Sequence, residues 1–421
     1  MKIKVKEADY DEVMAMESDR HLKPKCPSMA ARKLLKAASA GGLKKVGFTC
    51  NTIGMENWKA DEPALILMNH SSFLDLQIAA TLLYPRPFNI VCTSDGFVGK
   101  KALMQNIGCI PTHKFVTDVN LVKDMAYTVK NNRCSVLMYP EASYSFDGTA
   151  TPLPDSLGKL LKLLDIPVIM IKTYGSFSYD PLYNCLQTRD VRVSADMTYL
   201  LNTKEIREKS VQELNSILKE QFTFDNFRWQ QENHIAITED FRADGLNRVL
   251  YKCCSCGKEG CMEGKGTVLT CKACGKTHTL TEYGYLEAED GYTRFDHIPD
   301  WYRWEREEVK KEIEEGSYRL DVAVDIIIMK DMKAVYRVGQ GQLIHTKEGF
   351  HLTGCDGRLD YRQPPRASYS LYSDYYWYEI GDMICIGNKE ILYYCFPRNC
   401  KDVEAKTRLA AEELYKIVGA E

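Results

Sequence analysis

The sequence contains no long hydrophobic run, no secretory leader and no low-complexity tract. Its longest apolar stretches, residues 64–68 and 166–171, have the length of strands, whereas a membrane-spanning helix needs about 20 consecutive apolar residues. The N-terminus reads MKIKVKEADYDEV and alternates charged with apolar residues, unlike a signal peptide. We therefore expect a chain that does not span a membrane. Binding at a membrane surface is a separate question.

Composition indicates a folded protein of two or three domains in a reducing compartment. The chain has 421 residues, of which 45% are hydrophobic and 27% charged, with a formal net charge of −3. Most of its 16 cysteines are scattered singly through apolar stretches, and no export signal accompanies them. Such thiols are typical of the cytosol, so we expect no disulfides.

Acidic residues are missing between positions 20 and 55, where eight lysines and arginines occur. Within this stretch the pattern predicts a helix over residues 28–40 that ends at Gly41 and Gly42. Its apolar side would carry Ala31, Leu34, Leu35 and Ala38, and its basic side Arg32, Lys33 and Lys36. Two interpretations remain open: the helix rests on an anionic bilayer, or its apolar side packs on the next domain.

Residues 60–200 alternate short apolar runs with polar, helix-compatible stretches. The runs are residues 64–68, 89–93, 109–112, 135–139 and 167–173. This rhythm predicts an α/β domain with a mixed, largely parallel sheet. Functional residues of such sheets gather just beyond the carboxyl ends of the strands, where His70 and Glu141 occur.

A histidine and an aspartate five residues apart follow the first of these runs, in Asn69-His70-Ser-Ser-Phe-Leu-Asp75. On a turn that enters a helix, the carboxylate can reach one ring nitrogen of the imidazole and fix its tautomer. The other nitrogen can then accept a proton from an attacking hydroxyl. Glu141 ends another apolar run, where its carboxylate can bind an acceptor hydroxyl or hold neighbouring donors in place.

Four blocks resemble the pattern of the glycerolipid acyltransferase family, which includes lysophosphatidic acid acyltransferases. They are Asn69-His70-x4-Asp75, Gly108-Cys-Ile-Pro111, Pro140-Glu141 and Pro167-Val168. The resemblance covers roughly residues 60–200. It implies His70 as general base, Asp75 as the residue that orients it, and a thioester of coenzyme A or acyl-carrier protein as acyl donor. It also implies direct transfer at a membrane face, without an acyl-enzyme.

The blocks depart from the family where it binds the acceptor phosphate. Tyr144 stands where the family has an arginine, and a tyrosine hydroxyl cannot replace a forked guanidinium. The residues that we expect to bind substrate are Glu141, Ser143, Lys100, Lys101 and Lys114. Because the phosphate-binding arginine is missing, we expect acceptors without a phosphate to be tolerated better than in the family.

Two Cys-x-x-Cys pairs, Cys253/Cys256 and Cys271/Cys274, are separated by fourteen residues, and each is followed by Gly-Lys. This spacing is typical of a zinc ribbon with four thiolate ligands, a closed site that supports structure and not chemistry. The acidic residues that follow at 282–290 argue against nucleic acid as a partner.

The last third of the chain is predicted to be antiparallel β structure over residues 317–397, followed by a helix over residues 402–418. The order of elements resembles a pleckstrin-homology-like sandwich with its terminal helix. Residues 369–378 are heavily aromatic, which fits either packing across strands or a face that binds lipid or a partner.

Together these features predict four regions. They are a basic N-terminal segment (1–55), an acyltransferase domain (56–250), a zinc ribbon (251–290) and a C-terminal β-rich module (291–421). The predicted activity is O-acyl transfer to a lyso-lipid in phospholipid synthesis, with 1-acyl-glycerol-3-phosphate as the leading acceptor. The expected place of action is the cytoplasmic, inner face of an anionic membrane. The alternatives are a lyso-lipid acceptor without phosphate, or a catalytically degenerate protein that binds membrane or a partner.

The cysteine spacing predicts one tightly bound Zn²⁺ per chain, held by Cys253, Cys256, Cys271 and Cys274. Elemental analysis of protein purified without chelators is expected to find one equivalent. Cys256→Ser is expected to lose zinc and to melt at a lower temperature, because metal binding and folding of such a unit are coupled. Full zinc content and an unchanged melting temperature in that variant would contradict the prediction.

Overall fold

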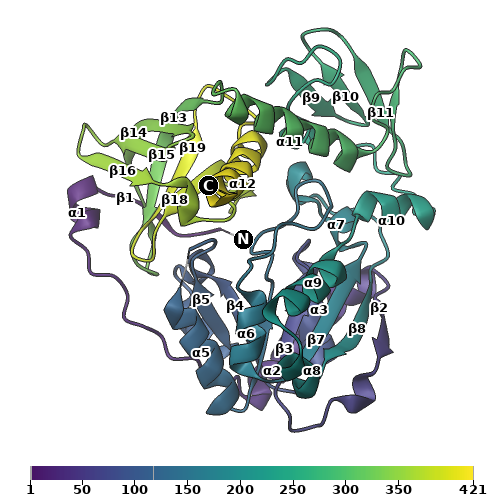
Figure 1. The fold of residues 1–421 in the computed structure, drawn as a ribbon, viewed down its shortest axis with the longest axis vertical. Helices are drawn as coiled ribbons and strands as arrows, with labels where there is room; N and C mark the ends of the chain where they lie inside the picture. Colours follow the sequence, from purple (N-terminus) through teal and green to yellow (C-terminus); the bar gives the residue numbers. More distant parts are fainter. Residues whose placement is uncertain (1, 117, 421) are drawn as a thin grey trace.

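The computed structural model describes residues 2–116 and 118–420. Figure 1 shows an α/β domain at the bottom, a large antiparallel sheet at the upper left and a small four-stranded sheet at the upper right. No helix in these two ranges combines the length and the apolar character needed to cross a bilayer.

Seven strands form the sheet of the α/β domain, in the order β2-β8-β7-β3-β6-β4-β5. The bounds are β2 Thr49–Ile53, β3 Leu65–Met68, β4 Phe88–Thr93, β5 Cys109–Thr112, β6 Ser135–Met138, β7 Val168–Tyr174 and β8 Ser194–Leu201. Only β7 and β8 pair antiparallel, so the expected mixed, largely parallel sheet is confirmed. The five predicted strands are present within one residue at each end, whereas β2 and β8 were not predicted.

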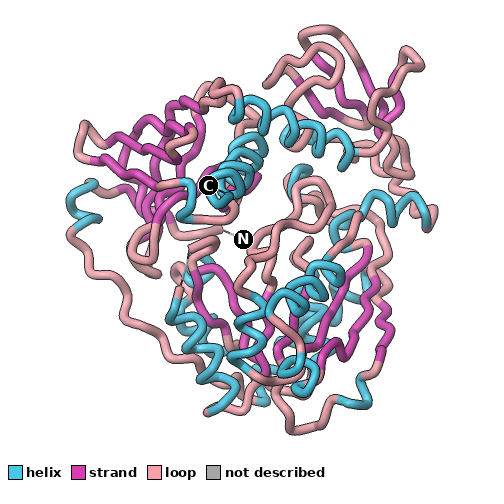
Figure 2. Tube along the Cα trace, viewed as in Figure 1, coloured by secondary structure: helices cyan, strands magenta, loops and turns pink. Residues whose placement is uncertain are grey.

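Helices cover both faces of this sheet because its central strands are apolar on both sides (Figure 2). In β3, Ile66 and Met68 pack against α2 (Met29–Lys45) and α3 (Leu74–Leu83). Leu65 and Leu67 face the opposite layer. That layer contains α5 Val119–Lys130, α6 Leu157–Leu164, α8 Thr203–Glu208 and α9 Val211–Phe222.

The basic helix is longer than predicted and uses a different face. Ser28 caps α2 as expected, but the helix continues through Gly41 and Gly42 to Lys45. Gly42 lies so close to α3 that a side chain there would collide with Gln77, so packing overrides the weak helix propensity of glycine. The buried positions are Ser39 and Leu43, while Leu34 is 72% exposed.

The predicted N-terminal segment, residues 1–55, is not a unit of its own. Its strand β1 (Val5–Glu7) pairs in parallel with β14 (Val335–Thr346) of the large antiparallel sheet. The short helix α1 (Tyr10–Met14) buries Tyr10 and Val13 in the core of that sheet. Strand β2 instead belongs to the α/β domain. The segment therefore divides between both sheets.

The small sheet carries the cysteine pairs and leads through a long helix to the large sheet. Its antiparallel strands are β9 Met262–Lys265, β10 Val268–Cys271, β11 Thr277–Leu280 and β12 Leu286–Ala288. Helix α11 (Ile298–Glu314), which was not predicted, follows and buries Trp301 and Val309.

The large sheet has the order β16-β15-β14-β13-β19-β18-β17, with all these neighbours antiparallel. The bounds are β13 Leu320–Met329, β15 Gly349–Gly354, β16 Leu359–Gln363, β17 Tyr372–Trp377, β18 Gly381–Gly387 and β19 Leu392–Pro397. Helix α12 (Glu404–Ala420) follows, close to the predicted range. The antiparallel architecture is confirmed, and the likeness to a pleckstrin-homology domain stays a prediction.

Asp95 of the α/β domain joins the two large sheets. Its side chain is 1% exposed and lies just after β4. Its carboxylate accepts hydrogen bonds from Tyr372 Oη at 2.8 Å and Trp377 Nε1 at 3.2 Å. Tyr394 Oη at 3.4 Å and Tyr378 Oη at 3.5 Å complete the group. Four aromatic side chains of the C-terminal sheet thus converge on one buried acid.

Asp95→Ala is expected to lower the free energy of unfolding by about 2–4 kcal/mol, because several buried donors lose their acceptor. Tyr378→Phe serves as the control, since it removes only the longest of these bonds and is expected to change stability by less than about 1 kcal/mol. Denaturant unfolding followed by fluorescence measures both. An Asp95→Ala curve that overlays the wild type would show that the carboxylate does not join the sheets.

Candidate active site

Two neighbouring parallel strands bring the predicted catalytic segments together. His70 follows β3 and Glu141 follows β6, and these strands pair with each other. Their carboxyl ends therefore meet at one edge of the sheet. Glu141 Oε2 accepts a hydrogen bond from the backbone nitrogen of His70 at 3.1 Å.

The Asp75 carboxylate orients the His70 imidazole. Oδ2 of Asp75 lies 2.9 Å from Nδ1 of His70 and accepts hydrogen bonds from the backbone nitrogens of Ser71 and Ser72 at 2.9 and 3.1 Å. Asp75 itself is fully buried in the first turn of α3. One oxygen therefore shapes the turn and selects the tautomer with the proton on Nδ1. This leaves the Nε2 lone pair available.

Burial keeps this imidazole neutral. It lowers the pKa of His70 below its usual value of 6.5, and the nearby Lys114 ammonium lowers it further. The hydrogen bond and charge of Asp75 act in the opposite direction. Because burial is the largest effect, the ring is unprotonated at neutral pH, the state that a general base requires.

Two tyrosines pack against the imidazole, a contact that the sequence did not predict for either of them. The Tyr139 ring stacks on His70 with centroids 4.1 Å apart, and the Tyr144 ring lies 4.3 Å away. Tyr144 also makes an edge contact with Phe73 at 5.9 Å. The residue in the position of the family's arginine therefore packs against His70.

Glu141 links the backbone at His70 to the backbone at Thr151. Its Oε1 accepts a hydrogen bond from the backbone nitrogen of Thr151 at 2.9 Å, while Oε2 is held by His70 as described. Burial raises the pKa of Glu141 to about 7. Asp180, another buried acid that the sequence gave no reason to select, lies near Asp75, and burial raises its pKa to about 8. Of the two roles considered for Glu141, the geometry matches holding neighbouring donors.

His70 opens into a cavity of about 1420 Å³ between the α/β domain and the C-terminal sheet. The α/β domain contributes Tyr139, Tyr144 and Leu160 to the cavity wall, and the C-terminal region contributes Tyr369 and Tyr372. This volume is larger than a typical small-molecule pocket of roughly 300–1,000 Å³ and suits a ligand with a long chain.

The predicted acceptor-binding residues divide into two groups. Lys100 and Lys114 line the cavity. Lys101 instead forms an ion pair with Asp19 at 2.7 Å. Ser143 is 3% exposed, and its hydroxyl accepts a hydrogen bond from Arg408, which lies outside the α/β domain.

Arg408 of α12 donates hydrogen bonds to the segment that follows Glu141. Its Nη2 donates to Ser143 Oγ at 2.8 Å and its Nη1 to the Tyr144 carbonyl at 3.3 Å. Nε of Arg408 donates a hydrogen bond to Oε1 of Glu412 at 3.3 Å. No sequence motif pointed to Arg408, because it lies 265 positions from Ser143 along the chain.

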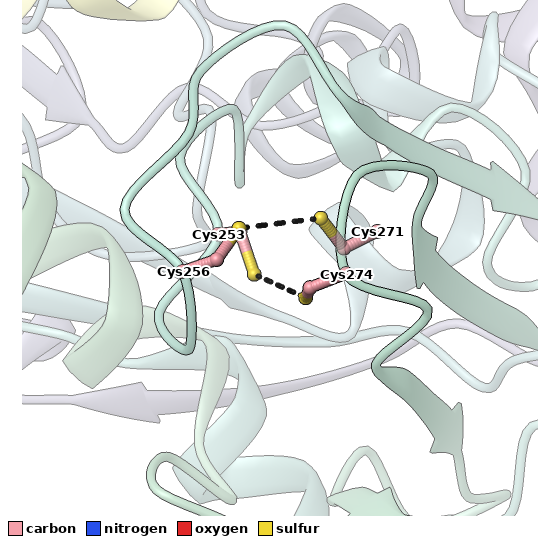
Figure 3. A group of neighbouring side chains, drawn as sticks. All are labelled: Cys253, Cys256, Cys271 and Cys274. Atoms are coloured by element: carbon pink, nitrogen blue, oxygen red, sulfur yellow. Dashed lines mark hydrogen bonds between the residues drawn. The ribbon is translucent and has the colours of Figure 1, made fainter.

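The four predicted zinc ligands converge at the edge of the small sheet (Figure 3). Cys253 and Cys274 have sulfurs 3.8 Å apart, and Cys256 and Cys271 have sulfurs 3.7 Å apart. A tetrahedron with Zn–S bonds of about 2.3 Å has sulfurs roughly 3.8 Å apart, so the donor set fits Zn²⁺. All four thiol groups would serve as ligands, and the structural role of the cluster stays a prediction.

The electrostatics predict how the pKa of His70 responds to its neighbours. Asp75→Asn is expected to lower it further, because a favourable charge is lost, and Lys114→Gln is expected to raise it. Nuclear magnetic resonance titration of labelled histidine, with His70→Gln for assignment, measures these values. A wild-type pKa above 6.5 would contradict this account of the site.

Part of the α/β domain matches a known family model. Residues 50–172 match the family model described as Acyltransferase, and no curated protein matches the chain. Among solved structures, the chain is similar to the 1-acyl-sn-glycerophosphate (LPA) acyltransferase PlsC from Thermotoga maritima. That match has 15% identity and a TM-score of 0.37, and it covers 45% of this chain and 76% of that chain. The matched segment holds His70, Asp75 and Glu141, so the family match falls on the same residues as the sequence blocks that resemble glycerolipid acyltransferases.

Proposed function

We propose that this protein transfers a fatty acyl group from an acyl thioester to the hydroxyl of a lyso-lipid. The observation that carries the proposal is a neutral, oriented histidine that opens into a lipid-sized cavity. Within the described residues Nε2 of His70 has no hydrogen-bond partner, whereas Nδ1 is held by Asp75. A purely structural histidine needs neither feature.

The proposed reaction is direct acyl transfer. Nε2 of His70 removes the proton of the acceptor hydroxyl as its oxygen attacks the thioester carbonyl carbon. The C–O bond forms, the C–S bond breaks, and the proton passes from His70 to the departing thiolate. Asp75 stabilises the transient imidazolium through Nδ1, and the stacked Tyr139 keeps the ring from turning. The donor is acyl-coenzyme A or acyl-carrier protein.

For the acceptor, 1-acyl-glycerol-3-phosphate remains the leading candidate within phospholipid synthesis. Its phosphate would be bound by Lys100 and Lys114, which line the cavity. Tyr144 adds no charge there. Two lysines bind phosphate as point charges and not as a fork, which also supports the alternative of an acceptor without phosphate.

We further propose that the enzyme works at the inner, anionic face of a membrane. Three large apolar side chains at the cavity are exposed: Leu103 by 59%, Val119 by 63% and Leu163 by 51%. They offer an apolar route for an acyl chain between bilayer and cavity. On α2, Leu34 and the adjacent Lys33 are also exposed, as expected of a surface that meets anionic lipid.

His70→Ala is expected to abolish transfer, and Asp75→Asn to lower kcat by roughly 10²–10⁴-fold while the protein stays folded. Thiol release from oleoyl-coenzyme A in the presence of lyso-lipid acceptors measures both. Asp356→Asn is the matched control, because its side chain is 98% exposed and lies in the C-terminal sheet region. Near wild-type turnover by His70→Ala would end the proposed mechanism and favour a degenerate binding protein.

A further inference from the structure

The C-terminal sheet places an acid on the cavity wall, close to the lysine that faces His70. Tyr372 and Asp374 are two positions apart in β17, where the strand pairs regularly with β18. Their side chains therefore point to the same face of the sheet. Both line the cavity. The ammonium of Lys114 lies 4.1 Å from the centre of the Tyr372 ring. Asp374 and Lys114 therefore share one region of the cavity.

These two charges do not neutralise each other by direct contact. In the ranges 2–116 and 118–420, no carboxylate forms an ion pair with Lys114, and Oδ1 of Asp374 is buried without a hydrogen-bond donor. Burial raises the pKa of Asp374 to about 7, and the charge of Lys114 moderates that effect. A positive charge next to this enclosed carboxyl group would stabilise its charged form.

The surroundings of Asp374 are those that proteins use to bind an ammonium group. Tyr372 and Tyr378 lie near Asp374 and also line the cavity. Aromatic faces attract cations, and an adjacent carboxylate adds a charged hydrogen bond. Lys114, nearer to His70, offers the complementary contact for an anionic group.

We infer that the acceptor carries a zwitterionic headgroup, whose anionic part binds Lys114 and whose ammonium binds Asp374 and the surrounding tyrosines. This inference rests on the proposed acyl transfer, but it replaces the leading acceptor, 1-acyl-glycerol-3-phosphate, which carries no ammonium, by a zwitterionic lyso-lipid. The anion is a phosphodiester or a carboxylate, as in a lysophosphatidylethanolamine or an amino-acid lipid with a free hydroxyl. The C-terminal sheet thereby supplies the specificity, and the α/β domain supplies the chemistry.

The test compares acceptors that differ in the ammonium. Purified full-length protein is given oleoyl-coenzyme A with lysophosphatidic acid, lysophosphatidylethanolamine or an N-(3-hydroxyacyl)ornithine, and kcat/KM is measured for each. At least one ammonium-bearing acceptor is expected to exceed lysophosphatidic acid by roughly ten- to a hundredfold, the effect of one charged hydrogen bond. The better of the two identifies the anion as phosphodiester or carboxylate.

Asp374→Asn is expected to reduce that preference to near unity, mainly through KM, and Asp356→Asn is expected to retain it. Dissociation constants of the same lyso-lipids, measured calorimetrically in mixed micelles, are expected to show the same loss of preference without depending on turnover. A wild type that prefers lysophosphatidic acid, or an Asp374→Asn variant that weakens all acceptors equally, would overturn the inference. Absence of transfer to every acceptor, with zwitterion-selective binding intact, would instead refute the proposed function alone.

Discussion

The contact between Asp95 and the aromatic side chains of the C-terminal sheet is the constraint on which the cavity depends. Without it the strand ends that carry His70 would face solvent, as the open edge of an α/β sheet usually does. With it, β17 lies over those ends and encloses a volume of about 1420 Å³. Arg408 of α12 makes a second contact, a hydrogen bond to Ser143. The C-terminal region therefore both lines the cavity and holds the loop that follows Glu141.

Inside this enclosure, low polarity decides the charge states. Burial raises the pKa of Glu141 and Asp374 to about 7 and that of Asp180 to about 8, and lowers the pKa of His70. Three donors converge on one oxygen of Asp75. This oxygen lies beside Nδ1 of His70, where the imidazolium of a general base would need it.

The sequence predicted what depends on local pattern. Five strands, the His70–Asp75 pair and the four converging cysteines follow from periodicity and spacing, and each is present. The ion pair of Lys101 with Asp19 and the extension of α2 past Gly42 were not predicted, because Asp19 and Gln77 come from elsewhere in the chain. Arg408 and Asp374 escaped prediction for the same reason: they reach the site only through the docking of a separate sheet. The aromatic run at 369–378 was noticed, but pattern alone could not distinguish packing from ligand contact. In the structure, Tyr372 both donates a hydrogen bond to buried Asp95 and lines the cavity.

The pairing of β1 with β14 has a consequence for how the chain is made. Arg337 and Glu7, which form an ion pair across these strands, are 330 positions apart. At a synthesis rate of about 5–20 residues per second, the first strand leaves the ribosome roughly 15–65 seconds before its partner exists. During that interval the α/β domain can fold, while residues 5–14 must remain unpaired. The charged residues in and next to β1, namely Lys4, Lys6 and Glu7, help to keep this unpaired segment soluble until its partner strand is made.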